Sequence, residues 1–439
     1  MSQMPRNEVS AVTMRGQRPL PSREKRDGAD HSSAAPVPVV AIAGTRGKST
    51  TCWLLHEILS DLGWPLGLWC STGVFVNGRR QLGELQPWSE VLQAVQRGEL
   101  RVAIQELEAP VVSSVGLPAH VYRLAAITTI CGNNEACLVS LEARHAARAQ
   151  RIVARSVHPS GCLVLNADDL DVLEAIDETD AEVVLFALHP DNPVLRRHLA
   201  SGRRAVWLED GVVVSGRAEE ILPLLRVQDV AFTLGGALTF QVQNLLCATA
   251  LAVCLDVPAS TIQEAARRFL PDPILLPGSC NVFEVRGATV VLDTSHHPWT
   301  LRQLIRGIRQ QPHRRTVIVS HAFEDANPEQ TSEAGTLLGR LGGLVILHGQ
   351  ITAGHLDLLK SGMIRNTPPP LIVTQPDEPA AIFAAVQLLR EGDLGLVITR
   401  DVDAAVRALR PHVSDLEPLS RRAPGIITHP AGHIDRRDK

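Results

Sequence analysis

The chain has 439 residues, enough for two or three domains at about 150 residues each. Hydrophobic residues make up 45% and charged residues 21%, as in an ordinary globular protein, and the net charge of −4 gives no basic surface for nucleic acid. Aromatic residues are only 3% of the chain, which also argues against base-stacking surfaces, so we expect no nucleic-acid partner.

The ends of the chain differ from its middle. No apolar run approaches the roughly 18 residues of a membrane span, and the polar N-terminus lacks the apolar core of a signal peptide. We therefore expect no membrane span and a cytoplasmic location. Residues 1–36 are polar and aperiodic, which predicts a disordered tail, and residues 413–439 are predicted to be a flexible tail. The eight cysteines form no CxxC pair, so we expect small hydrophobic core residues and no zinc ribbon.

The packed chain is expected to begin at residues 37–43, a continuous apolar run typical of a buried parallel strand. A glycine-rich turn follows at 44–49, and a helical pattern of apolar residues at 50–62. The alternation then continues with helix 90–97, strands 102–107 and 124–130, helix 142–157, strands 162–166 and 183–188, short antiparallel strands within 203–241, and helices 244–254 and 260–269, the last with Ser260 as N-cap. This order predicts an α/β domain over residues 37–270.

The Pro-rich stretch 271–280 predicts a hinge, after which a second alternation begins. Its expected elements are strands 281–285 and 288–293, helix 298–310, strand 315–320, helix 329–342, strand 344–347, helix 352–360, strand 371–374, helix 379–391, strand 394–398 and helix 402–409. This pattern predicts a doubly wound, Rossmann-like α/β domain over residues 281–412.

The turn after the first strand has the composition of a phosphate-binding loop. Backbone N–H groups of such a loop, with the following helix N-terminus, cradle phosphate oxygens. Lys48 would bridge the terminal phosphates of ATP, and the Ser49 hydroxyl would bind Mg²⁺. Lys48 stands out because the chain has only four lysines among 43 basic residues, and arginine replaces a compact point charge poorly. The expected nucleotide-binding residues are Gly44, Thr45, Arg46, Gly47, Lys48, Ser49 and Thr50.

The alternative is a glycine-rich turn with an incidental lysine, because the general phosphate-loop spacing requires glycine where Ile42 stands. Four further segments follow the loop in order: Val164–Asp169, Gln243–Ala248, Pro277-Gly278 and Val291–Pro298. Together with the Gly-Thr-x-Gly-Lys-Ser-Thr spacing, they resemble the Mur ligase family, whose members activate a carboxylate with ATP and join it to an amine. The resemblance covers about residues 37–410.

This resemblance implies a fold: a Mur-ligase-like central phosphate-loop ATPase domain plus the C-terminal doubly wound domain. Within the family the chain is closer to poly-γ-glutamate synthase, and to the C-terminal ligase region of cyanophycin synthetase over Pro277–Pro298. Because the loop already occurs at residue 44, we expect no N-terminal UDP-sugar-binding domain.

The resemblance also implies roles for residues outside the loop. Glu106, at the end of a strand, stands at a metal position beside Ser49, with Glu108 as a weaker candidate, and Asn134 stands at a second metal position. Asn244 stands where a family asparagine contacts adenine at the start of a helix.

Asp293 would orient the ribose or the amine, and His296 would stabilise the phosphate or the tetrahedral species. The expected catalytic residues are therefore Lys48, His296 and Asp293, and the site is expected in the cleft between the two domains. A structural alternative for Asp293 is a cap on the helix that begins at Pro298. Asp168 and Asp169 are structural candidates as well.

Several positions depart from the family pattern. Asn134 replaces a metal-binding histidine, Gln150 stands near the place of a carbamylated lysine, Ser279 replaces a hinge arginine, and His297 replaces an asparagine. A neutral amide is a weak ligand for a hard dication. Two interpretations follow: an enzyme that works with one Mg²⁺ in a reshaped site, or a nucleotide-binding partner subunit with weak or no ligase chemistry.

The resemblance thus implies an ADP-forming amide ligase with ATP and Mg²⁺ as cofactors and an amino acid or peptide as small-molecule substrate. A single ligation and a polymerisation both remain open, as does a membrane or pathway partner protein. His321 and Asp325 follow a strand of the C-terminal domain and are weaker candidates for function.

Overall fold

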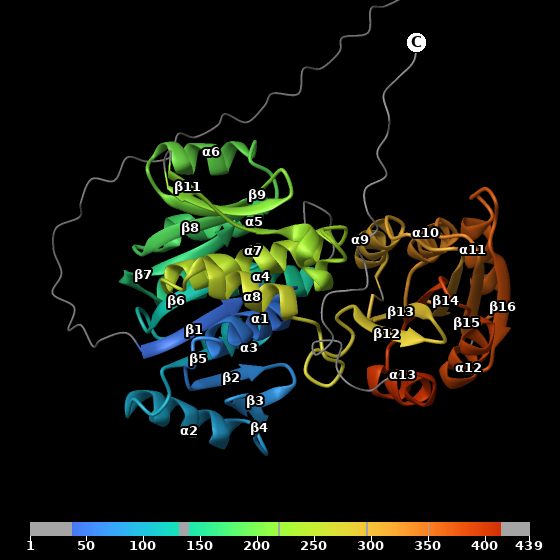
Figure 1. Cartoon of the computed structure of the whole chain (residues 1–439), viewed down its shortest axis with the longest axis horizontal. Helices are drawn as coiled ribbons and strands as arrows, with labels where there is room; N and C mark the ends of the chain where they lie inside the picture. The colour runs from blue at the N-terminus through green and yellow to red at the C-terminus, as the bar shows by residue number, and fades with distance from the viewer. Residues whose placement is uncertain (1–36, 131–139, 218–219, 296, 350, 414–439) are drawn as a thin grey trace, which may run out of the picture. The chain divides into compact units, whose positions relative to one another are not determined.

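The computed structural model describes residues 37–130, 140–217, 220–295, 297–349 and 351–413. The two predicted tails lie outside these residues, apart from Val413. The described residues form two β-sheets together with the helices that pack on them (Figure 1).

The first sheet has eleven strands in the order β11-β10-β9-β8-β7-β6-β1-β5-β2-β3-β4. Its middle, from β9 to β2, is parallel, and antiparallel strands extend it at both edges. The strands are β1 Val37–Ala43, β2 Leu66–Cys70, β3 Gly73–Val76, β4 Arg79–Arg80, β5 Val102–Glu106, β6 Tyr122–Ile127, β7 Val157–Asn166, β8 Glu182–Ala187, β9 Arg204–Glu209, β10 Val212–Arg217 and β11 Glu220–Arg226.

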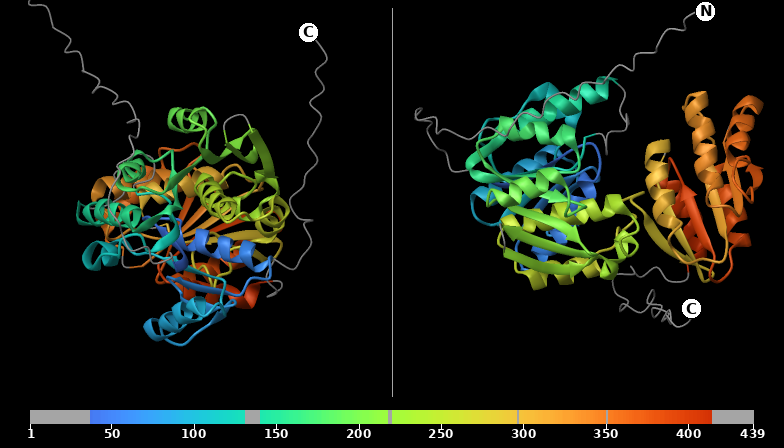
Figure 2. Two further views of the ribbon diagram at one scale, coloured as in Figure 1. Left: turned by 90° about the vertical axis from the view of Figure 1, so that its left-hand side faces the viewer. Right: turned by 90° about the horizontal axis from the view of Figure 1, so that it is seen from above.

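Helices cover both faces of this sheet (Figure 2). One buried cluster joins the sheet to α1, α7 and α8, and a second cluster joins its other face to α2, α3, α4 and α6. The helices are α1 Lys48–Ser60, α2 Leu85–Gln96, α3 Ala109–Val115, α4 Ser140–Ser156, α5 Leu170–Leu173, α6 Pro193–Ala200, α7 Thr239–Cys254 and α8 Ala259–Arg268. Most of α7 is buried, and apolar residues dominate its sequence, although Gln241 and Asn244 are among the buried side chains.

The second sheet has the order β12-β13-β17-β14-β15-β16, parallel from β13 onward. Helices α9, α10 and α11 pack on one face and α12 and α13 on the other, which confirms the doubly wound arrangement. Its elements are β12 Asn281–Val285, β13 Ala288–Asp293, α9 Pro298–Ile308, β14 Thr316–His321, α10 Pro328–Gly339, β15 Leu344–His348, α11 Ala353–Met363, β16 Leu371–Gln375, α12 Glu378–Leu388, β17 Leu394–Ile398 and α13 Val402–Leu409.

Some sequence expectations need correction. The short antiparallel strands expected within 203–241 are present as β9, β10 and β11 and end at Arg226, and α7 begins at Thr239, five residues before its expected start. Ser260 does not cap α8, because Pro258 holds that position. The short elements β2, β3, α3 and α6 were missed, since neither their length nor their pattern separates them from loops.

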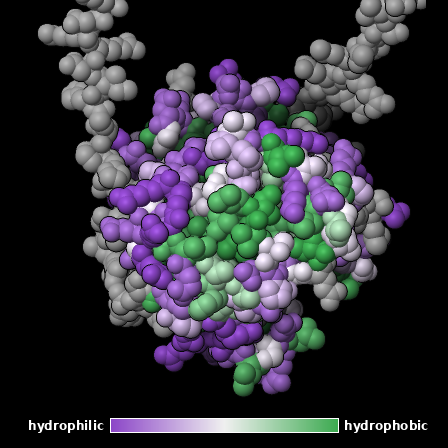
Figure 3. Space-filling model, turned by 90° about the vertical axis from the view of Figure 1, so that its right-hand side faces the viewer, coloured by the Kyte–Doolittle hydropathy of each residue, from purple (hydrophilic) through white to green (hydrophobic). Residues whose placement is uncertain are grey.

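The surface shows apolar side chains gathered at the edge of the second sheet, on the face in Figure 3. Leu371 and Val373 on the edge strand β16 are 73% and 43% exposed, and Phe383 on α12 is 57% exposed. Among the described helices, none combines the length and the apolar character that a bilayer crossing requires.

Candidate active site

The loop between β1 and α1 depends on two glycines. Gly44 and Gly47 have φ angles of 129° and 79°, which side-chain-bearing residues rarely adopt. A Cβ atom at Gly44 would lie 2.2 Å from the Thr128 hydroxyl, and one at Gly47 would lie 2.1 Å from the Asn244 amide oxygen. The backbone of the loop therefore passes closer to its neighbours than any larger residue would allow.

The segment after β6 holds this loop in place. The Thr45 N–H donates to the Thr129 carbonyl over 2.8 Å, and the Thr45 hydroxyl donates to the Ile130 carbonyl over 2.6 Å. The Thr128 hydroxyl donates to the Arg46 carbonyl over 2.6 Å. These bonds explain why β6 ends at Ile127 and not at residue 130 as expected. Thr45, expected among the nucleotide-binding residues, anchors the loop with both its backbone N–H and its hydroxyl.

The N-terminus of α1 is open toward the loop. Gly47 is its N-cap, and no side chain caps the first turn. The helix begins at Lys48, two residues earlier than expected, so Lys48, Ser49 and Thr50 belong to that turn. Uncapped N–H groups and the positive end of the helix dipole form an anion site.

Lys48 and Ser49 face the end of β5. The Lys48 ammonium lies 3.6 Å from Glu106 Oε1 and 3.4 Å from Glu108 Oε1. The Ser49 hydroxyl donates to Glu106 Oε1 over 3.1 Å, and the Ser71 N–H donates to Glu106 Oε2 over 3.1 Å. Burial raises the pKa of the Glu106 carboxyl, and the Lys48 charge opposes that rise. Both glutamates turn toward Lys48, as the strand alternation predicts.

This corner fits the implied magnesium ion. A serine hydroxyl and a buried carboxylate are adjacent hard oxygen donors, and Mg²⁺ in phosphate sites uses one or two carboxylates together with the phosphates. Asn134, the other expected metal ligand, lies outside the described residues. No group of three or more His, Cys, Asp or Glu side chains within the described ranges could hold a metal ion without such phosphates.

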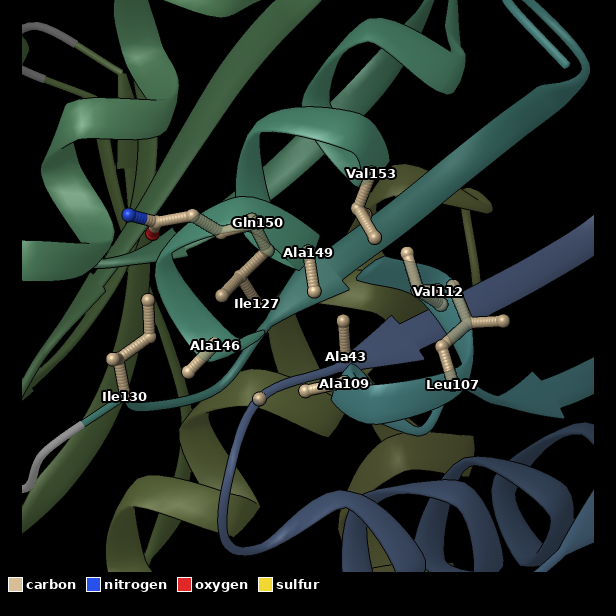
Figure 4. Close-up of a pocket in the computed structure, with 11 residues that line it drawn as sticks. Ala43, Leu107, Ala109, Val112, Ile127, Ile130, Ala146, Ala149, Gln150 and Val153 are labelled. Atoms are coloured by element: carbon tan, nitrogen blue, oxygen red, sulfur yellow. The ribbon is translucent and has the colours of Figure 1, made fainter. Parts of the chain in front are cut away.

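Gln150 on α4 borders a small cavity whose lining is mostly apolar. Figure 4 shows it at the margin of a cavity of about 10 Å³, roughly the space of one water. Apart from Gln150 and Gly44, the lining is aliphatic: Ala43, Leu107, Ala109, Val112, Ile127, Ile130, Ala146, Ala149 and Val153. The Gln150 amide oxygen is buried without a hydrogen-bond partner among the described residues. The position expected for a carbamylated lysine therefore holds a neutral amide beside an apolar cavity.

A second opening, of about 180 Å³, joins the loop to the second sheet. Arg46, Gly47 and Thr50 line it from the loop side, and Ser279 and Asp293 line it from the second sheet and the segment before it. Asn244 lines it as well, from the second turn of α7 and not from the start of that helix, and donates to the Gln241 side chain over 2.9 Å. The structure thus brings five of the expected site residues to this cleft: Arg46, Gly47, Thr50, Asn244 and Asp293.

Asp293, the last residue of β13, is held by its own neighbours. Its Oδ2 accepts from the Cys280 N–H and the Cys280 thiol, both over 3.1 Å, and its Oδ1 accepts from the Ser295 hydroxyl. Burial raises the pKa of this carboxyl. The cap proposed for it is wrong: His297 caps α9, accepting from the Trp299 N–H over 3.3 Å.

Four further sequence candidates have different outcomes. His296 lies outside the described residues. The Arg46 guanidinium stacks over the Trp299 ring at 5.1 Å, so this loop side chain reaches α9. Asp168 and Asp169 are structural as proposed: Asp168 accepts from the Leu188 N–H, and Asp169 accepts from the Ile130 N–H and caps α5.

Sequence reasoning missed a polar pocket of about 430 Å³ at the carboxyl ends of β14, β15 and β17. Its lining residues are His321, Glu324, His348, Glu378, Arg400 and Asp401. His348 Nε2 lies 3.7 Å from Glu378 Oε1, and neither atom has a hydrogen-bond partner within the described part of the chain. Burial lowers the pKa of His348 and raises that of Glu378. Only His321 was noted in the sequence; Asp325 instead pairs with Arg400 over 2.8 Å.

The structure combines a glycine-rich loop at the N-terminus of a helix with a second, doubly wound sheet, and residues of both line one cleft, an arrangement typical of α/β proteins that bind phosphorylated ligands. Residues 42–252 match the family model of the Mur ligase middle domain. The fold is Mur-ligase-like, and the chain is related to the Mur ligase family, as the sequence motifs indicated.

Individual relatives agree with this assignment. Cyanophycin synthetase from Synechocystis sp. is 23% identical over 381 residues, which are 85% of this chain and 44% of that protein. The chain thus spans less than half of this relative's length. A UDP-N-acetylmuramoyl-L-alanyl-D-glutamate–2,6-diaminopimelate ligase from Chelativorans sp. is 23% identical over 88% of this chain and 79% of its own length. The solved bifunctional folylpolyglutamate synthase/dihydrofolate synthase of Yersinia pestis, complexed with AMPPNP and Mn ion, has a TM-score of 0.56 at 17% identity, covering 86% of this chain and 89% of that one.

Proposed function

We propose that this protein is an ATP-dependent ligase that activates a carboxylate as an acyl phosphate and joins it to an amine, releasing ADP and phosphate. The observation that carries the proposal is the Lys48–Ser49–Glu106 corner at the open end of α1, beside a cleft that the second sheet also lines. Relatives named as ligases and synthetases, one of them solved with AMPPNP and Mn ion, support it.

In the first step a carboxylate oxygen attacks the γ-phosphorus of ATP, and the bond to the leaving ADP oxygen breaks. The uncapped N–H groups of α1 and the Lys48 ammonium hold the phosphates in line, so catalysis rests on positioning and charge. Mg²⁺, when bound, would add positive charge at the phosphates, held by Ser49 and Glu106. Because Gly47 has no Cβ, the loop backbone can approach the Asn244 side chain of α7 closely.

In the second step the amine attacks the acyl carbon, phosphate leaves, and the amine loses a proton. We place the amine at the polar pocket of the second sheet, where Glu378 and His348 offer unsatisfied atoms. Burial lowers the pKa of the His348 imidazole, which favours its neutral form. A neutral imidazole can accept the proton that the amine loses.

A second candidate function is a nucleotide-binding partner that lacks ligase chemistry. The observation in its favour is Gln150, whose neutral amide borders an apolar cavity where the family resemblance implies a charged group. The two candidates share nucleotide binding and differ in turnover, so one assay separates them.

The test measures ADP and phosphate release with a panel of amino acids and short peptides offered as acid and amine, together with mass spectrometry of the product. For Lys48→Ala we expect turnover to fall on the order of 10²–10³-fold, since one preorganised charge on the transferring group is lost. Lys360→Ala, which removes an exposed lysine on α11, is the matched control and should leave turnover unchanged.

Each outcome has a clear meaning. Turnover that needs both an acid and an amine, and that collapses in Lys48→Ala alone, supports the ligase. ATP binding that depends on Lys48, without turnover for any pair in the panel, favours the partner subunit. Formation of AMP and pyrophosphate would exclude the acyl-phosphate route.

A further inference from the structure

Two side chains that can donate hydrogen bonds lie together at the cleft beside the phosphate loop. Arg46 belongs to the loop between β1 and α1, and Trp299 lies in the first turn of α9, directly after Pro298. The Arg46 guanidinium lies over the Trp299 ring at 5.1 Å, and both residues line the cleft of about 180 Å³. Trp299 was not among the expected site residues.

The backbone is anchored on both sides of this contact. The Arg46 carbonyl accepts from the Thr128 hydroxyl over 2.6 Å, and Gly47 then turns the chain into α1 with a φ angle of 79°. On the other side, the His297 ring caps the first turn of α9 by accepting from the Trp299 N–H. The Trp299 side chain is therefore fixed at the cleft, and the residue is only 8% exposed.

Both side chains contain a buried N–H group without an acceptor. The Arg46 Nε and Trp299 Nε1 atoms have no hydrogen-bond partner among the residues that the structure describes. Guanidinium and indole nitrogens can only donate, so each of these groups requires an acceptor. Because buried donors without an acceptor are rare in folded proteins, two of them beside one cleft indicate an acceptor that a ligand supplies.

The charges of the cleft favour an anion as that ligand. Among the described residues that line it, the charged ones are Arg46 and Asp293. Both Asp293 oxygens already accept hydrogen bonds from Cys280 and Ser295, whereas no carboxylate in the described ranges pairs with Arg46. A guanidinium that stacks on an aromatic ring keeps the donors at its edge, and such donors match the geometry of a phosphate group.

We propose that Trp299 is a nucleotide-binding residue of α9: its ring holds the Arg46 guanidinium, and its indole N–H donates together with Arg46 to one phosphate group. Phosphate is favoured over a substrate carboxylate because Arg46 stands two residues before Lys48, on the loop that leads into the uncapped N-terminus of α1. The inference rests on the nucleotide binding of the proposed function, which the ligase and the partner subunit share. It adds a contact from the second sheet's own helix to a nucleotide held by the loop.

The test measures the affinity of the full chain for AMPPNP with Mg²⁺ by isothermal titration calorimetry. Trp299→Phe keeps an aromatic ring beside Arg46 and removes only the N–H, so the Kd should rise about tenfold, as expected for one hydrogen bond to a charged group. The matched control is Trp64→Phe, because Trp64 also has a guanidinium over its ring, that of Arg101 at 4.5 Å, but does not line the cleft. Its Kd should equal that of the native chain.

A second measurement asks whether the two residues bind the same group. Arg46→Gln removes the guanidinium charge and should also raise the Kd for AMPPNP. In the double variant with Trp299→Phe, the loss of affinity should be smaller than the product of the two single losses, because donors that share one ligand group are coupled. Circular dichroism checks that each variant is folded.

The outcomes separate this inference from the proposed function. Native affinity in folded Trp299→Phe, with binding lost in Lys48→Ala, would overturn the inference and leave the proposed function in place. Native affinity in Trp299→Phe beside weaker binding in Trp299→Leu would assign the effect to the ring and not to the N–H, which also overturns it. Single losses that multiply in the double variant would place the two residues on separate groups. A native chain that does not bind AMPPNP would overturn the inference and the proposed function together.

Discussion

Glu106 and Asp293 hold equivalent places in the two sheets. Each is the last residue of a buried strand, β5 and β13, and burial raises the pKa of each carboxyl. Their partners differ. Glu106 faces the Lys48 ammonium and the Ser49 hydroxyl, whereas Asp293 is bound by Cys280 and Ser295 of its own connecting segments. The partners, and not the position at a strand end, separate a carboxylate that contacts a lysine and a serine from one that is bound by its own connecting segments.

Among changes at the strand ends, the largest effect is expected for Glu106→Gln. The amide keeps the shape of the side chain but loses the negative charge beside Lys48 and Ser49, so ADP release should fall on the order of 10²-fold. Turnover at saturating ATP and magnesium, measured beside circular dichroism, checks this. Glu108→Gln is the matched control, because Glu108 also contacts Lys48 but its side chain is 53% exposed, and its effect should stay within a few-fold. Equal losses in both variants would contradict the contrast drawn between the two strand ends.

An intermediate effect is expected for Asp293→Asn, and it concerns stability. One amide nitrogen would face the donors of Cys280 or Ser295, so the free energy of unfolding should fall by about 1–3 kcal/mol. Urea denaturation measures this loss, while turnover per folded molecule should change less than in Glu106→Gln. A variant with native stability and lost turnover would place Asp293 among the catalytic residues, as the family resemblance implied.

The pH dependence of stability tests the direction of the pKa shift at Asp293. Because burial raises the pKa of Asp293 in the folded chain, the folded state binds this proton more tightly than the unfolded state. The contribution of Asp293 is therefore full below the unfolded pKa of about 3.9 and declines as pH rises through the folded pKa. The free energy of unfolding is measured against pH for the native chain and for Asp293→Asn. The difference between the two curves should isolate this decline. An opposite slope would mean that the hydrogen bonds to the carboxylate outweigh its burial.

The smallest effect is expected for His297→Ala at the start of α9. Its ring nitrogen accepts from the Trp299 N–H, and loss of such a cap costs about 0.5–1 kcal/mol. A shift of the urea midpoint, with turnover unchanged, would fit a capping role. A tenfold loss of turnover at unchanged stability would instead bring this segment into the reaction.

The sequence predicted much of the secondary structure. β12, β13, β17 and α13 have the expected bounds, because short apolar runs between turn residues and amphipathic helices are local signals. The phosphate loop was also a local signal, since the positive φ angles at Gly44 and Gly47 belong to the turn itself. Errors gathered where tertiary contacts set an end. β6 stops early because Thr128 bonds to the loop, and α7 starts early, where Gln241 and Val242 of its first turn are already buried.

The candidate site was predicted in part. The sequence indicated Lys48, Ser49 and Glu106, and the structure places them in contact. The pocket with His348 and Glu378 was missed, because its residues come from different strand ends that only the order of the sheet brings together.

By itself, then, the sequence determined the alternation of strands and helices, the anion-binding turn and its lysine, since these depend on residues that are neighbours in the chain. Only the tertiary structure determines which partner each buried polar group contacts. Asp293 turns to Cys280, and Gln150 turns to an apolar cavity. These contacts depend on the order of the strands in each sheet and on how the helices pack against the sheets. The protonation and reactivity of a buried group depend on the partners that this packing places beside it.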